Sequence, residues 1–374
     1  MNSGVEIYFA IHIAVLATIL LDVFPFSRTV KKWVVIFWCV FFTLFGGFRW
    51  QIGGDWAQYY YHFRHSDFSN VFSYMRYGDR KLEWGFVLLN ATVKYLFSKF
   101  FIYNLLICGF IQYTRYKVCS ILCKDYALTA YCMLTLLAVH YFAKRAELGS
   151  AVALWLFIFI KNQEIKKFIP LNYLAFIIHH QGLVMAPMYW IGKIKLKWYY
   201  FIVLLITVSV SVYFFQDLFI NAAAFIGGDV GNVALHYTEY QTEGREARGI
   251  STLLLNLFFA VVFLWVRKGS GKEKDVWYNA QLNMFLIQTS MYMVFSDGMD
   301  DLSRLGTLLI FAKILLLINV IRFAKEKKYT IVQVVAWLFI FVYVGQKVSK
   351  LDSWYFFYDC NVPYKTIFDY RIYK

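Results

Sequence analysis

The densest set of residues that could do chemistry lies in the segment 46–63, GGFRWQIGGDWAQYYYHF, where an apolar run stops. Arg49 provides a planar fork of hydrogen-bond donors that matches a phosphate group. The glycine pair that ends at Gly54 allows backbone amides to approach the same group closely. Asp55 adds a carboxylate, and the aromatic residues that follow, Tyr59 among them, offer flat faces that suit a sugar ring. The segment therefore predicts the rim of a site that faces water.

Each part of this segment also has a purely structural interpretation. Arg49 and Asp55 could form a surface ion pair that closes a loop, a contact that contributes little to stability. The aromatic residues could belong to the belt that tryptophan and tyrosine form at membrane interfaces, which is their commoner role. These residues are Trp50, Trp56, Tyr59, Tyr60 and Tyr61. The sequence leaves both interpretations open.

A second charged group, Lys144-Arg145-Ala146-Glu147, opens an apolar helix. A lysine beside a membrane can extend its ammonium group to the interface, which explains Lys144. An arginine at the membrane edge is costly and is by default a functional hypothesis. Because Glu147 is so close, we expect a local network and not a lone anchor.

Two adjacent histidines, His179 and His180, precede Gln181 and Gly182 at an interruption of an apolar stretch. One such histidine is usually neutral and satisfied by a structural hydrogen bond. Two of them at a helix break favour a working base or a hydrogen-bond donor. We expect the stretch to divide there into two short segments that meet at the external side.

A late acidic cluster is followed by an arginine. Helical spacing puts Asp300 and Arg304 on one face, with Asp301 one turn from the same arginine. The plain interpretation is a helix start with an acidic first turn and an internal ion pair. The functional interpretation is that Arg304 completes a cationic cluster with Arg49 and Arg145, and that one aspartate is a base.

The motifs for several kinds of chemistry are absent from the sequence. The six cysteines lie mostly in apolar segments, and no second Cys or His pair accompanies Cys119 and Cys123, which argues against a zinc site. No P-loop, Rossmann fingerprint, serine-hydrolase elbow or HExxH motif is present. We therefore expect neither a metal nor a cofactor.

The composition is that of a membrane protein. Of the 374 residues, 60% are hydrophobic and 21% aromatic, more than a soluble core absorbs. The formal net charge of +15 comes from short basic clusters between apolar runs, as in cytoplasmic loops under the positive-inside rule. No basic tail or RNA-reading motif appears, so we expect no nucleic acid partner.

The apolar runs predict an all-α, polytopic fold of about 12 transmembrane helices. We expect residues 1–374 to form a single transmembrane domain, with external loops near 49–81, 216–249 and 296–304. The cytoplasmic loops carry plain lysines, whereas the external side collects arginines, carboxylates, histidines and aromatics. Any chemistry therefore faces outward.

The number of membrane crossings after the first external loop is ambiguous. If both 84–97 and 100–117 crossed the membrane, every later basic loop would lie on the external side. Either one of these pieces lies along the interface or re-enters, or both belong to a single long, tilted helix. The segment 84–97 is short and carries Asn90 and Lys94, which makes it the weaker span.

The order of these motifs resembles the EpsG family of exopolysaccharide and O-antigen polymerases of the Wzy type. The resemblance extends over nearly the whole chain and is carried by FRWQIGGDWAQYYYHF, LEWGFVLLN at 82–90, KRAELGSAVALWLF at 144–157, HHQGLVMAPMYW at 179–190, a late arginine and Pro363-Tyr364. Two features depart from the family pattern. Glu147 and Leu148 replace the more usual glutamine and small residue, and the histidine is doubled, with His180 the preferred counterpart because Gly182 follows it.

The resemblance implies a metal- and nucleotide-independent glycosyltransferase, multi-pass in the bacterial inner membrane with its active face outward. It would transfer a growing glycan from undecaprenyl pyrophosphate to the next lipid-linked repeat unit, and a chain-length regulator is a further expected partner. The predicted catalytic residues are His180, Asp55 and Glu83, and the predicted substrate-binding residues are Arg49, Gly54, Tyr59, Arg145, His179 and Arg304.

Two other classes of membrane protein stay open. A lipid-linked oligosaccharide flippase would also be polytopic and arginine-bearing, but it needs polar groups through the midplane. A sugar O-acyltransferase has its essential histidine in a spanning segment, and its acyl donor usually arrives from the cytoplasm. The outward bias of the polar residues fits both alternatives less well.

Overall fold

The computed structural model describes residues 5–74, 81–138, 142, 144–207, 250–294, 304–349 and 364–369. Helices make up most of these residues, and none of them belongs to a β-strand. The chain divides into two compact units, Met1–Leu183 with Thr330–Lys374, and Val184–Tyr329. This division does not test the expected single transmembrane domain, which stays a prediction.

The described helices include spans of membrane-crossing length. Four helical stretches are long and apolar enough by length and composition, and they are Glu6–Val23, Arg28–Gly47, Phe100–Leu137, which includes the turn at Lys124, and Gly306–Glu326. Two shorter apolar helices are Trp198–Thr207 and Thr330–Gln346. The protein is therefore an all-helical, multi-pass membrane protein, and the total of about 12 crossings stays a prediction.

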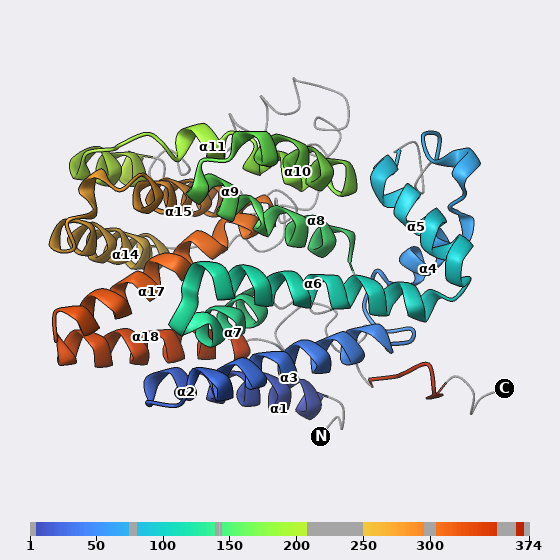
Figure 1. The fold of residues 1–374 in the computed structure, drawn as a ribbon, viewed down its shortest axis with the longest axis horizontal. Coiled ribbons are helices and arrows are strands. Elements are labelled where there is room, and N and C mark those ends of the chain that lie inside the picture. Colours follow the sequence, from blue (N-terminus) through green and yellow to red (C-terminus); the bar gives the residue numbers. More distant parts are fainter. Residues whose placement is uncertain are drawn as a thin grey trace. The chain divides into compact units, whose positions relative to one another are not determined.

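The first unit has a core of long apolar helices around α6 (Phe100–Cys123). α3 (Arg28–Gly47) lies along α6 (Figure 1), with so little space between them that a Cβ added at Gly47 would lie 2.4 Å from the Leu105 side chain. α7 (Ala127–Ala138) folds back against α6 after a turn at Lys124. The remaining helices of this core are α1 (Val5–Thr18), α2 (Leu20–Val23) and α18 (Thr330–Ser349).

A smaller helical pair precedes α6. α4 (Trp56–His65) packs against α5 (Trp84–Phe97), and the 3-10 helix η1 (Phe68–Asn70) lies between them in the chain. Ser98 ends α5 in the left-handed conformation, with φ 53°, before α6 begins. α5 and α6 are therefore two helices, and the interpretation of one long, tilted helix is wrong. An interfacial or re-entrant position of α5 stays a prediction.

Three further helices complete the first unit. These are α8 (Arg145–Leu154), α9 (Leu156–Asn162) and α10 (Ile165–Ile178), and the 3-10 helix η3 (His180–Met185) follows α10. The break after α10 agrees with the interruption expected at the histidine pair. The buried Asn172 side chain donates to the Gly182 carbonyl oxygen at 2.8 Å and so holds the turned chain against α10.

Glycines bring the backbones together around this break. A Cβ added at Gly85 of α5 would lie 2.7 Å from Ile177 Cγ1 and 2.8 Å from the Ile177 carbonyl oxygen. An added Cβ would lie 2.9 Å from His179 Cβ at Gly149 of α8, and 2.7 Å from the Ala175 carbonyl carbon at Gly182. Because all these distances are shorter than ordinary carbon contacts, larger residues would push α5, α8 and η3 away from α10.

The second unit is built on α15 (Val276–Val294), which packs against α17 (Ile310–Glu326) and the 3-10 helix η6 (Arg304–Leu309). Its other described helices include α11 (Met188–Ile191) and α14 (Ile250–Gly269). Arg267 at the end of α14 donates to the Leu196 carbonyl and to Asn279, each at 3.0 Å. The expected external loop 216–249 lies outside the described residues, as does the loop 296–304 apart from its last residue.

We predict that Gly85→Ala lowers stability by about 1–3 kcal/mol, because the new methyl group overlaps Ile177 and must displace α5 or α10. Thermal unfolding of the detergent-purified protein measures the loss. Gly345→Ala in α18 is the matched control, since an added Cβ there meets nothing within 4 Å. A Gly85→Ala protein as stable as the control would show that the close crossing is not needed.

Candidate active site

Three ion pairs meet at the N-terminal end of α8, and each links α8 to a different part of the first unit. They are Lys144 Nζ to Asp55 Oδ2 at 3.6 Å, the Arg145 guanidinium to the Glu83 carboxylate, and Arg115 Nη2 to Glu147 Oε2 at 3.0 Å. The network expected around Lys144 and Glu147 therefore exists, and its partners come from the turn before α4, from the start of α5 and from α6.

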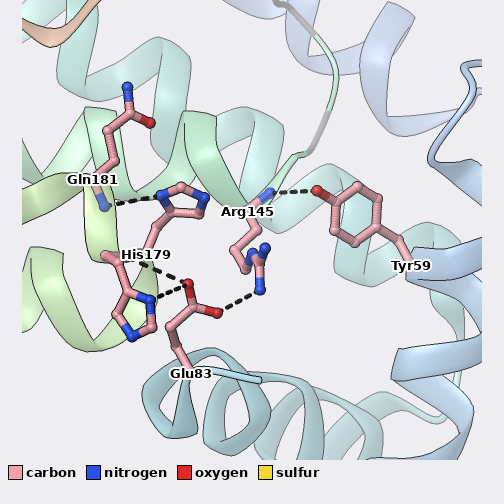
Figure 2. Close-up of polar contacts among 6 residues, drawn as sticks. Tyr59, Glu83, Arg145, His179 and Gln181 are labelled. Atoms are coloured by element: carbon pink, nitrogen blue, oxygen red, sulfur yellow. Dashed lines mark hydrogen bonds and ion pairs between the residues drawn. The ribbon is translucent and has the colours of Figure 1, made fainter. Parts of the chain in front are cut away.

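Glu83 occupies the centre of the cluster as the N-cap residue of α5, with its side chain only 6% exposed. One carboxylate oxygen accepts from the Arg145 guanidinium (Figure 2). The other accepts from the His180 backbone N–H at 3.3 Å and lies 3.6 Å from His180 Nδ1. One buried carboxylate thus connects α5, α8 and the break after α10.

The two histidines differ in their surroundings. The His180 ring is 66% exposed, and its Nδ1 faces Glu83. His179 is half-buried, and its Nδ1 accepts from the Gln181 backbone N–H at 3.2 Å. The His180 ring therefore combines a nearby carboxylate with access to solvent, whereas one nitrogen of His179 is used by the turn itself.

Tyr59 joins the start of α8 to α4. Its hydroxyl oxygen accepts from the Arg145 backbone N–H at 3.2 Å, which satisfies one of the donors left open at a helix start. Burial and the charge of Asp55 raise the pKa of this hydroxyl, whereas the positive charges of Arg145 and Arg49 lower it. The hydroxyl thus lies in the electrostatic field of both arginines.

Arg49 lies inside the protein and not on its surface. The residue is 1% exposed, its guanidinium donates to the Ile52 carbonyl at 3.1 Å, and it lies 4.5 Å from the centre of the Phe142 ring. Burial lowers the pKa of this guanidinium. Gly53 has φ 92° and passes so close that an added Cβ would lie 2.9 Å from Arg49 Nη1.

The interpretation of Arg49 and Asp55 as a surface ion pair is therefore wrong. The half-exposed Asp55 carboxylate pairs with Lys144, and it acts on the enclosed Arg49 only as a nearby charge. Gly54, predicted to bind substrate through its backbone, is exposed in the turn that leads into α4.

A C-terminal segment covers the Arg49 loop. Trp50 N–H donates to the Lys365 carbonyl at 2.9 Å, and Ile367 N–H donates to the Phe48 carbonyl at 3.0 Å. The Tyr364 ring stacks on Phe45 at 4.3 Å, and its hydroxyl donates to the Phe45 carbonyl. Sequence reasoning noted Tyr364 only as part of the resemblance and had no signal for its partner.

Arg304 begins η6 in the second unit, and its side chain lies outside the described residues, as do Asp300 and Asp301. The cationic cluster of Arg304 with Arg49 and Arg145 therefore stays a prediction. Within the described ranges, no group of three or more His, Cys, Asp or Glu side chains lies close enough to hold a metal ion.

The chain matches a known protein family over most of its length. The EpsG family model matches residues 32–366, which is nearly the whole chain. The protein belongs to the EpsG family. This is a Wzy-type, polymerase-like family of membrane proteins, and the matched range contains every residue of the cluster around Glu83. No curated protein and no solved structure matches the chain.

For this EpsG protein we predict a strong energetic coupling between Glu83 and Arg145. Glu83→Ala should lower the free energy of unfolding by about 2–3 kcal/mol, because it leaves a charge without its partner in a mostly buried place. Arg145→Met should restore part of this loss when it is added to Glu83→Ala. A double-mutant cycle of unfolding free energies measures the coupling, and strictly additive losses would contradict the prediction.

Proposed function

We propose that this protein is a membrane glycosyltransferase that joins lipid-linked oligosaccharide repeat units into O-antigen or exopolysaccharide. The donor is a glycan on undecaprenyl pyrophosphate, the acceptor is the next lipid-linked unit, and the reaction takes place on the outer face of the bacterial inner membrane. The observation that carries the proposal is the Glu83 carboxylate shared by Arg145 and His180, because it sets a cation beside a candidate base. Membership of the EpsG family supports the same reaction class.

Arg145 is the proposed contact for the pyrophosphate leaving group. The donor already carries a good leaving group, so the protein needs fixed cations where negative charge develops, and no nucleotide. The Arg145 side chain is 16% exposed and Lys144 beside it is 27% exposed, so both can reach a ligand at the surface. Arg49 is enclosed, and its role in this proposal is to hold the loop after α3 in place. A phosphate contact of Arg49 or Arg304 stays a prediction.

His180 is the proposed general base for the acceptor hydroxyl. A carboxylate near Nδ1 can orient an imidazole so that Nε2 takes a proton, as in catalytic triads. The 3.6 Å between Glu83 and His180 Nδ1 is longer than a hydrogen bond, and such contacts often shorten when substrate binds. Both oxygens of Glu83 already accept hydrogen bonds, which favours an orienting role for this carboxylate. Asp55 stays the alternative base.

The proposed step is a single displacement. The acceptor hydroxyl oxygen forms a bond to the anomeric carbon of the donor sugar while the bond from that carbon to the pyrophosphate breaks. The hydroxyl proton passes to His180 Nε2, and the electron pair of the broken bond stays on the undecaprenyl pyrophosphate. One displacement inverts the anomeric centre and needs no covalent intermediate on the protein, by analogy with inverting glycosidases.

We predict that Arg145→Ala and His180→Ala abolish polymerisation, with rates lower by about 10²–10⁴-fold for loss of the base. The measurement is the length distribution of surface glycan in a deletion strain complemented with each variant, at matched membrane expression. Caps of a single repeat unit are the expected result. Arg28→Ala is the matched control, because Arg28 is 85% exposed in its pair with Asp125.

Three outcomes of this experiment would contradict the proposal. A normal ladder with Arg145→Ala and His180→Ala would show that these residues are structural. Complete absence of exported repeat units in the deletion strain would favour a lipid-linked oligosaccharide flippase, since a polymerase mutant still exports single units. A normal ladder in the deletion strain whose sugars have lost acyl groups would favour a sugar O-acyltransferase.

A further inference from the structure

A surface hollow lies on one face of α4, apart from the Glu83 cluster. Its volume is about 650 Å³, and the described residues that line it are Ala57, Gln58, Tyr60, Tyr61, Arg64 and His65. All six belong to α4, and no carboxylate is among these described residues. The mechanism proposed above uses none of them.

The opposite face of α4 attaches the helix to the protein. Trp56 and Phe63 are buried, and Tyr59 contacts the backbone of Arg145. Successive residues of a helix are about 100° apart, so Tyr59 and Tyr61 point in nearly opposite directions. Tyr61 is 41% exposed. The Tyr61 ring therefore lies on the exposed face of α4.

The side chains of the hollow combine flat rings with hydrogen-bond donors. The Tyr61 and His65 rings stack at 3.9 Å, and the Arg64 guanidinium lies 5.8 Å from the centre of the Tyr60 ring. Lys94 Nζ donates to the Arg64 carbonyl at 3.1 Å and adds positive charge nearby. A sugar has an apolar C–H face that can lie on such a ring and hydroxyls that can pair with amide, imidazole and guanidinium groups.

We propose that this hollow is a holding subsite for sugar residues of the growing glycan, which rests on the polymerase function proposed above. It lies on the face of α4 opposite Tyr59, about one helix diameter of 10 Å from the Arg145 side. A sugar bound there is therefore not the reacting sugar but one further along the chain. Holding it keeps the glycan near the site between transfers and raises its effective concentration there.

The subsite predicts shorter polymers when its exposed aromatic and cationic side chains are removed. Tyr61→Ala and Arg64→Ala, each in the complemented deletion strain, should shift the most abundant glycan to roughly half the repeat number or less, because a released chain rebinds more slowly. Single-repeat caps should not accumulate, since Arg145 and His180 are intact. Tyr95→Ala is the matched control, because Tyr95 is 76% exposed on the neighbouring α5.

A binding measurement tests the same subsite without polymerisation. The probe is oligosaccharide released by mild acid from the surface polymer of the same strain, titrated against the purified protein in lipid nanodiscs. Loss of one ring contact should weaken binding about tenfold for Tyr61→Ala. Tyr95→Ala should leave the affinity unchanged.

The outcomes separate this inference from the proposed function. Unchanged chain length and affinity with Tyr61→Ala would overturn the holding subsite while the reaction stands, and would leave these rings as part of the interfacial belt. Single-repeat caps with Tyr61→Ala would overturn it too, by making the hollow part of the reacting site. A normal ladder with Arg145→Ala would instead overturn the proposed function.

Discussion

The arrangement of the first unit depends on the Glu83 carboxylate. A carboxylate that is only 6% exposed is costly to place in a protein unless its charge is paired and its oxygens accept hydrogen bonds. Arg145 provides the charge and the His180 backbone provides the second hydrogen bond. The same contacts fix the start of α5, the start of α8 and the break after α10 relative to one another. The close approaches at Gly85, Gly149 and Gly182 allow these three elements to come near enough for one side chain to join them.

The N-terminal end of α8 is constrained by two ion pairs that reach different helices. Arg145 points to Glu83, whereas Glu147, two residues later, pairs with Arg115 of α6. Both members of that second pair are at most 10% exposed, so removal of either would leave a buried charge. The two pairs tie the start of α8 to α5 and to α6 and leave its first turn little freedom to rotate. The cation beside the proposed base is thus positioned by a neighbour that does not touch it.

The features that depend on local sequence pattern could be predicted from the sequence. The apolar run at 84–97 gives the bounds of α5, and the polar interruption at the histidine pair gives the end of α10, because both boundaries follow from residue type. Family membership was also recognisable from the order of the motifs. The choice between two helices and one long helix at 84–117 stayed open, since a left-handed Ser98 leaves no mark in hydropathy. The partner of Asp55 was missed because a choice between Arg49 and Lys144 depends on segments distant in the chain.

The cover over the Arg49 loop comes from residues 364–369, which follow α18 in the chain, while the loop itself directly follows α3. During synthesis, the loop must therefore wait for nearly all of the chain before Tyr364 can stack on Phe45 and the Lys365 carbonyl can accept from Trp50. Until then the Arg49 loop lacks these contacts with residues 364–369. A partly inserted chain would therefore lack the cover over the Arg49 loop. The folding of this loop is thus coupled to the completion of membrane insertion.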